Sequence, residues 1–148
     1  MTEGFDLQRY LHEHIPLSAA MGVSVLHRSD DNVVLDAPLQ PNINHRDSVF
    51  GGSASALAIL AAWSLVHTRL ESAGVRSRLV IQRNSIEYSK PIFGQFSASA
   101  TLAEPGRWTP FLGMLKRKGR ARIAVASVLL YEGHAAGTFE GEFVAFLP

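Results

Sequence analysis

The order of apolar and polar positions predicts a short helix, a hairpin, one long apolar helix and then a series of strands. After Asp6, which can cap a helix, apolar residues recur at helical spacing to about His14, and Pro16 ends that helix. Residues 22–28 and 32–38 each alternate between apolar and polar positions. Because the Ser-Asp-Asp between them is typical of a turn, we expect these two segments to form a hairpin.

The long helix is predicted from Gly51 to about Ser72. The segment is rich in alanine, leucine and small residues, and Gly74 stands where a glycine commonly follows a helix end. Most of the segment carries no formal charge, a feature that transmembrane helices share. Its small-residue content, together with Trp63 and His67, instead favours a helix buried inside a protein core.

Four further strands and one short helix are predicted after the long helix. Thr109 and Pro110 fit the cap and first position of the short helix, and Gly119 fits its end. In order, the predicted elements are strands over 78–90 and 93–102, a helix over 111–118, and strands over 121–131 and 135–147. Because strands follow one another without alternating helices, we expect an α+β fold in which an antiparallel sheet wraps the central helix.

Composition narrows the class of protein. A chain of 148 residues fits a single domain over 1–148, and a net charge of +1 gives no electrostatic reason to expect nucleic acid. The absence of cysteine excludes disulfides, thiolate metal sites and a cysteine nucleophile. His12 and His14 would point to different sides of a helix, and no other metal-ligand spacing occurs. We therefore expect a cytoplasmic protein with no metal, no cofactor and no membrane partner.

The candidate chemistry lies in residues 42–53, which read Asn-Ile-Asn-His-Arg-Asp-Ser-Val-Phe-Gly-Gly-Ser. The first turn of a helix carries unpaired N–H groups and a partial positive charge, and glycine lets a ligand approach the backbone closely. Gly51 and Gly52 are therefore suited to holding an oxyanion or a polarised carbonyl oxygen. The alternative is that these glycines only allow the helix to pack closely against a strand.

Several segments taken together resemble the thioesterase family of the YiiD C-terminal-domain type. Those segments are Asn42 to His45, Phe50 to Ser53, Ala56 to Ala58 with Trp63, Ser85 to Pro91, Gly119 to Ile123 and Phe139 to Ala145. The similarity covers nearly the whole chain after the first helix. It implies a hotdog fold, an acyl thioester substrate and a pocket that lies between two protomers.

A more distant resemblance is to acyl-CoA thioesterases of the phenylacetyl-CoA type. Their pattern, Asn-x-x-Gly-x-x-His-Gly-Gly, is matched by Asn44, Gly51 and Gly52, while Asp47 stands at the Gly position and Phe50 at the His position. Those enzymes also carry a carboxylate about two turns into the central helix. No acid occupies that part of this helix, so a catalytic base would have to come from the loop or from a partner subunit.

The loop offers two candidate bases and one residue that could orient a water molecule. Histidine changes charge near neutral pH, which suits His45 to base catalysis, and Asp47 is the second candidate. Asn44 could orient the attacking water. The structural alternatives are an Asx-turn for Asn44 and a left-handed turn residue for Asp47.

Six further residues are candidates for substrate contact. Phe50 and Trp63 could line an acyl tunnel, although aromatic residues on a buried helix are more often part of the core. The resemblance implies that Asn84 and Glu87 could reach a neighbouring subunit's site. The other two candidates are Ser53, in the first helical turn, and Arg120, in a basic run that could hold coenzyme A phosphates or simply end a helix.

The favoured function is hydrolysis of an acyl-CoA or acyl-carrier thioester by direct attack of water. One alternative is a non-catalytic acyl-CoA-binding module, which the missing helix carboxylate would suit. A hydroxyacyl-thioester dehydratase is a further alternative, although it would need a carboxylate facing a histidine. A homodimer or tetramer is expected, because pairing would cover an edge strand of the sheet.

Overall fold

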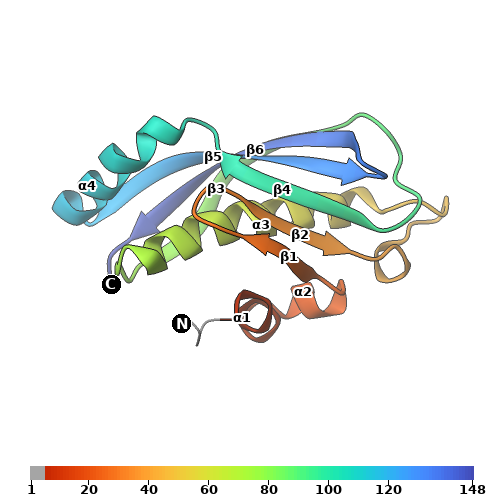
Figure 1. Cartoon of the computed structure of the whole chain (residues 1–148), viewed down its shortest axis with the longest axis horizontal. Coiled ribbons are helices and arrows are strands. Elements are labelled where there is room, and N and C mark those ends of the chain that lie inside the picture. Colours follow the sequence, from red (N-terminus) through yellow and green to blue (C-terminus); the bar gives the residue numbers. More distant parts are fainter. Residues whose placement is uncertain (1–5) are drawn as a thin grey trace.

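The computed structural model describes residues 6–148, in which six strands form one antiparallel sheet. The strands are β1 (Ser24–Arg28), β2 (Val33–Ala37), β3 (Arg78–Tyr88), β4 (Phe96–Leu102), β5 (Arg120–Tyr131) and β6 (His134–Phe146). Their order across the sheet is β1-β2-β4-β5-β6-β3. Figure 1 shows the sheet curving along the long helix α3 (Gly51–Ser72), which confirms the predicted fold class.

The central helix α3 is buried on most sides, as its lack of charge predicted. Its alanines let the sheet approach closely, and Leu57, Ala61 and Leu65 have no exposed surface. The Ser127 hydroxyl of β5 donates to the Ala58 carbonyl oxygen at 2.9 Å, joining the inner face of the sheet to the helix. None of the helices within residues 6–148 has the length and apolar content that a membrane crossing requires.

The first two helices follow their sequence signals. The Asp6 side chain caps α1 (Leu7–His14) by accepting from the Arg9 backbone N–H at 3.2 Å. Pro16 ends this helix and occupies the first turn of the short helix α2 (Pro16–Ala20). Both helices lie beside β1 at one edge of the sheet, as Figure 1 shows.

The predicted start of the helix after β4 was wrong. A 3₁₀ turn, η3 (Pro105–Arg107), leads directly into α4 (Trp108–Lys118), so the helix begins before Thr109 and the N-cap is Arg107. Pro110 therefore lies inside the first turn, where a missing N–H removes no intrahelical hydrogen bond. Gly119 ends the helix in the left-handed conformation, as expected.

Two of the predicted strands, 78–90 and 93–102, were also too long. β3 ends at Tyr88, because the Ser89 and Lys90 backbone N–H groups both turn to the Ala136 carbonyl oxygen, at 2.9 and 3.2 Å. The next strand, β4, begins only at Phe96, after a loop.

The two edges of the sheet differ. Along β1, the Val25 backbone N–H donates to Gln8 Oε1 at 2.9 Å, and His12 Nε2 donates to the Val23 carbonyl oxygen at 2.8 Å. Helix α1 therefore covers this edge with two side chains one helical turn apart. Within residues 6–148, no element pairs with the outer edge of β3, where Val80 is 50% exposed.

An aromatic stack joins α1 to α3. The Tyr10 ring lies between His14 and His67, with ring centroids 4.0 and 4.8 Å away, and the Trp63 ring stacks on His67 at 4.6 Å. Burial lowers the pKa of His67 below its ordinary value of 6.5, and His14 and Arg28 act in the same direction, against the opposing effect of Glu71. Folding therefore favours the neutral form of His67 over the protonated form.

Candidate functional site

The loop before α3 is fastened at Asn42, which ends a 3₁₀ turn, η2 (Gln40–Asn42). Asn42 is 2% exposed, and its Nδ2 donates to the carbonyl oxygens of Met21 at 2.9 Å and Pro38 at 2.8 Å. Its own carbonyl oxygen accepts from the Phe50 backbone N–H at 2.7 Å. Both ends of the loop thus meet at Asn42, a role that the sequence did not reveal.

Asn44 closes the tip of this loop from within. Its Oδ1 accepts from the Arg46 and Ser48 backbone N–H groups at 2.8 and 3.1 Å, and its Nδ2 donates to Ser48 Oγ at 3.0 Å. This is the Asx-turn geometry considered above. Asp47 has φ 64°, the left-handed conformation that suits a position where the related pattern has glycine. His45 and Asp47 are both exposed on the outside of the loop.

The start of α3 presents unpaired backbone donors. Phe50 is the N-cap and provides no side-chain cap, while the Ser53 and Ala54 backbone N–H groups both turn back to the Phe50 carbonyl oxygen, at 2.9 and 3.1 Å. Among the hydrogen bonds found in residues 6–148, none uses the N–H of Gly51 or Gly52 as a donor. These two amides can therefore bind an external oxygen atom.

The glycines also bring neighbouring rings close to the backbone. A Cβ placed on Gly52 would lie 2.4 Å from the ring of Phe50, which is half exposed and folds over the first turn. A Cβ placed on Gly51 would meet the Tyr88 ring at 3.5 Å, an ordinary van der Waals distance. The tight contact of Gly52 is with the helix's own N-cap residue, and the Gly51 contact with β3 is of ordinary length, so these distances do not support close packing against a strand as the reason for the pair.

A hollow of about 260 Å³ lies beside Gly51. Its lining combines apolar Val49 and Ile92 with the Tyr88 ring and Lys90. The Tyr88 hydroxyl donates to the Gly51 carbonyl oxygen at 3.0 Å, so the last residue of β3 contacts the first residue of α3. Sequence reasoning did not single out Tyr88, because no local pattern shows which strand ends beside this helix.

Two predicted contact residues on α3, Ser53 and Trp63, lie at different positions along the helix. Ser53 is half-buried in the first turn, beside the two glycines. Trp63 lies about 18 Å further along the helix axis than Gly51. Its Nε1 donates to the Leu79 carbonyl oxygen at 2.9 Å, and its ring is part of the stack with His67. This position matches the core alternative for Trp63.

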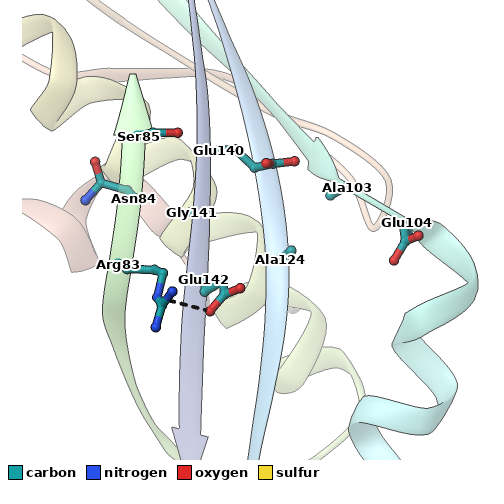
Figure 2. Close-up of a pocket in the computed structure, with 9 residues that line it drawn as sticks. All are labelled: Arg83, Asn84, Ser85, Ala103, Glu104, Ala124, Glu140, Gly141 and Glu142. Carbon is teal, nitrogen blue, oxygen red and sulfur yellow. Dashed lines mark ion pairs between the residues drawn. The ribbon is translucent and has the colours of Figure 1, made fainter. Parts of the chain in front are cut away.

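Asn84 and Glu87 lie on opposite faces of β3. Asn84 is opposite Gly141, on the face of the sheet that covers α3, whereas Glu87 is opposite exposed Thr138 on the outer face. Figure 2 shows Asn84 pointing to the opposite side of β3 from Ser85. The two residues therefore cannot act together in one site on this chain.

The outer face of the sheet carries another hollow, of about 400 Å³. Glu104, Glu140 and Glu142 line it, and Arg83 Nε lies 3.6 Å from Glu142 Oε1 (Figure 2). Nowhere in residues 6–148 do three or more histidine or acidic side chains form a group that could hold a metal ion. This hollow does not include the start of α3.

Arg120 lies far from the start of α3 within one chain. It begins β5 directly after α4, at the end of the molecule where α3 finishes (Figure 1). With 22 residues, α3 is about 33 Å long. Arg120 Cζ lies 5.2 Å from the centre of the Phe146 ring, and Arg78 is opposite Phe146 on its other side. Arg120 therefore shares a basic row with Arg78 and does not join the loop residues.

A six-stranded antiparallel sheet around a long central helix, with an uncapped Gly-Gly helix start, defines a protein of the hotdog class. The family model described as "Putative thioesterase (yiiD_Cterm)" matches residues 5–147, and the chain belongs to that family. The family assignment supports thioester hydrolysis as the general activity of this class of protein.

Solved structures agree with this assignment. A protein of unknown function from Chlorobaculum tepidum is 25% identical, with a TM-score of 0.90 over 96% of this chain and 93% of that chain. A "putative thioesterase" from Shewanella oneidensis is also 25% identical, with a TM-score of 0.85 over 96% of this chain and 95% of that chain. A mutant form of the phenylacetic acid degradation protein PaaI from Thermus thermophilus shares the fold at 20% identity, with a TM-score of 0.67 over 90% of this chain and 99% of that chain.

Proposed function

We propose that this protein hydrolyses an acyl thioester, with coenzyme A or a carrier protein as the leaving group, by direct attack of water at the start of α3. The observation that carries the proposal is the pair of unpaired amides at Gly51 and Gly52. Gly51 lines a hollow, and the loop that precedes the helix has an exposed His-Arg-Asp tip. The family assignment supports the same chemistry.

The carbonyl oxygen of the thioester would accept hydrogen bonds from these amides. Each donor of this kind is typically worth about 3 kcal/mol in the transition state. A thiolate is a good leaving group, so a strong general acid is not required. Activation of water is the remaining task.

The loop would provide that activation, because α3 carries no carboxylate until Glu71, near its other end. His45 and Asp47 are the candidate bases. Asn44, whose side chain is engaged inside the loop, would hold both at their positions and would not bind the water itself.

A second copy of the chain would complete the site by pairing along the open edge of β3. Antiparallel pairing about the middle of this strand would put Arg78 of one copy opposite Tyr88 of the other, next to Glu87, and Val80 opposite Ile86. The arginine and the glutamate have complementary charges, and Tyr88 contacts Gly51. Such a dimer would also put Asn84 near the shared boundary and bring the other copy's basic row towards the start of α3.

The dimer is tested by light scattering on the purified protein. Val80→Lys puts a charge on the open edge and is expected to give a monomer. The matched control is Leu26→Lys on β1, where Leu26 is 60% exposed, and it should leave the mass unchanged. A Val80→Lys protein that is folded and still dimeric would contradict pairing through β3.

The reaction is tested with a panel of acyl-CoA thioesters and a thiol-detecting reagent. Loss of a general base typically costs about 10²- to 10⁴-fold in rate, so His45→Ala or Asp47→Ala should lower kcat by that order. His27→Ala, at an exposed position on β1, is the matched control. Hydrolysis that survives the double replacement of His45 and Asp47 would refute the assignment of the base.

The same assay separates the rival functions. Tight binding of acyl-CoA with no release of thiol from any substrate would favour a binding module, for which the absence of an acid near the start of α3 is the supporting feature. Conversion of a hydroxyacyl thioester to an enoyl thioester, without release of thiol, would instead indicate a dehydratase.

A further inference from the structure

Tyr88 makes a hydrogen bond to the peptide unit that carries one of the two proposed oxyanion donors. Its hydroxyl donates to the Gly51 carbonyl oxygen at 3.0 Å. That carbonyl and the N–H of Gly52 belong to the same planar peptide group and point in opposite directions. The hydroxyl thus binds one end of a peptide dipole whose other end faces the proposed thioester oxygen.

This contact can affect the Gly52 N–H in two ways. First, a hydrogen bond to the carbonyl oxygen polarises the peptide group and makes its N–H a stronger donor. Second, two successive glycines have more backbone freedom than any other pair, and the N–H groups of a helix's first turn have no intrahelical acceptor. A side chain that holds the Gly51 carbonyl therefore restricts the direction of the Gly52 N–H.

The end of β3 is built so that Tyr88 reaches this position. Tyr88 is opposite Gly137 of β6, where an added Cβ would lie 2.8 Å from the Glu87 carbonyl oxygen. Two backbone N–H groups just beyond Tyr88 then converge on the Ala136 carbonyl oxygen, which ends the strand. Tyr88 remains 54% exposed, so its contact with Gly51 is not a by-product of burial in the core.

We propose that Tyr88 is a positioning residue for thioester hydrolysis, which orients and polarises the Gly51–Gly52 peptide so that the Gly52 N–H stabilises the oxyanion. The inference rests on the proposed function of the start of α3. It assigns to Tyr88 no contact with the substrate. The role lies in the hydroxyl group alone, because the ring would still pack against Gly51 without it.

The test is Tyr88→Phe, which keeps the ring and removes the donor. Because a single neutral hydrogen bond acts here through another group, kcat should fall by about three- to tenfold with KM unchanged. Tyr131→Phe is the matched control, since this half-buried tyrosine packs against Gly94 and should tolerate the change without loss of kcat. A rise in KM with unchanged kcat would make Tyr88 a substrate contact and overturn the positioning role.

A second measurement works without substrate. The proton and nitrogen chemical shifts of the Gly52 amide report its polarisation, and Tyr88→Phe should move them upfield, whereas Tyr131→Phe should not. Unchanged shifts together with an unchanged kcat would overturn the proposal. Shifts that move in a protein whose wild type releases thiol from no acyl-CoA would support the Tyr88–Gly51 coupling and refute the proposed function, so the two failures are distinguishable.

Discussion

The two asparagines of the loop before α3 should respond in opposite ways to the same substitution. Asn42 uses its amide nitrogen to donate to two carbonyl oxygens, whereas Asn44 uses its amide oxygen to accept from two backbone N–H groups. Replacing the amide by a carboxylate removes donors and keeps acceptors. Asn42→Asp should therefore be severely destabilising, and Asn44→Asp should be tolerated.

The magnitudes follow from burial and bonding. Asn42→Asp loses two hydrogen bonds of about 1 kcal/mol each and places a charge against two carbonyl oxygens at a site that is 2% exposed. An uncompensated buried charge costs about 3–5 kcal/mol, so the free energy of unfolding should fall by about 3 kcal/mol or more. Asn44→Asp keeps both accepted hydrogen bonds, and Ser48 Oγ can donate to the new oxygen, so its cost should stay below about 1 kcal/mol.

The measurement is urea unfolding, followed by circular dichroism at one protein concentration, for both Asp variants and for Asn42→Ala. Asn42→Ala should lie between the other two, since it removes the donors without adding charge. Equal stabilities for Asn42→Asp and Asn44→Asp would refute the assigned orientations of the two amides and, with them, the account of how the loop is fastened.

Two further predictions concern stability. Because burial lowers the pKa of His67 below 6.5, the unfolded chain takes up the proton first, so the free energy of unfolding should fall as the pH drops below about 6.5 and level off below the folded-state pKa. His67→Gln should flatten that decline in a series of Tm measurements between about pH 7.5 and pH 5. The control is His27→Gln, and the prediction is contradicted if both variants show the same dependence of Tm on pH. Gly137→Ala should cost about 1–3 kcal/mol, because its Cβ would lie 2.8 Å from a backbone oxygen, while Gly106→Ala, with nothing within 4 Å, should be close to neutral in the same urea assay.

Local signals were enough to predict most of the fold. The cap at Asp6, the charge-free run that begins at Gly51 and the alternation that ends at Leu102 each depend on neighbouring residues only, and each is found in the structure. The start of α4 was misjudged because Thr109 and Pro110 are equally compatible with the middle of a first turn. Which of these positions starts the helix depends on the preceding 3₁₀ turn, which leaves no distinct sequence pattern.

The candidate site was only partly visible in the sequence. The amides of Gly51 and Gly52 could be anticipated because a helix start leaves its donors unpaired wherever it occurs. The contact between Tyr88 and Gly51 depends on the register of β3 against β6, including an irregularity between Ile81 and Arg83, and no local pattern predicts that register. Asn84 and Glu87 are an odd number of residues apart, so strand alternation alone puts them on opposite faces; only which of the two faces α3 depends on the register.

The contacts of Gln8 and His12 with β1 have a consequence for self-association. A sheet with two open edges can add further copies at both ends and polymerise, whereas a sheet with one open edge stops growing after a single pairing. Helix α1 occupies the backbone groups of Val23 and Val25 that a third copy would need. If the chain pairs through β3 as proposed, this first helix would limit the assembly to two copies, and a protease that removed it would free a second edge to which further copies could add.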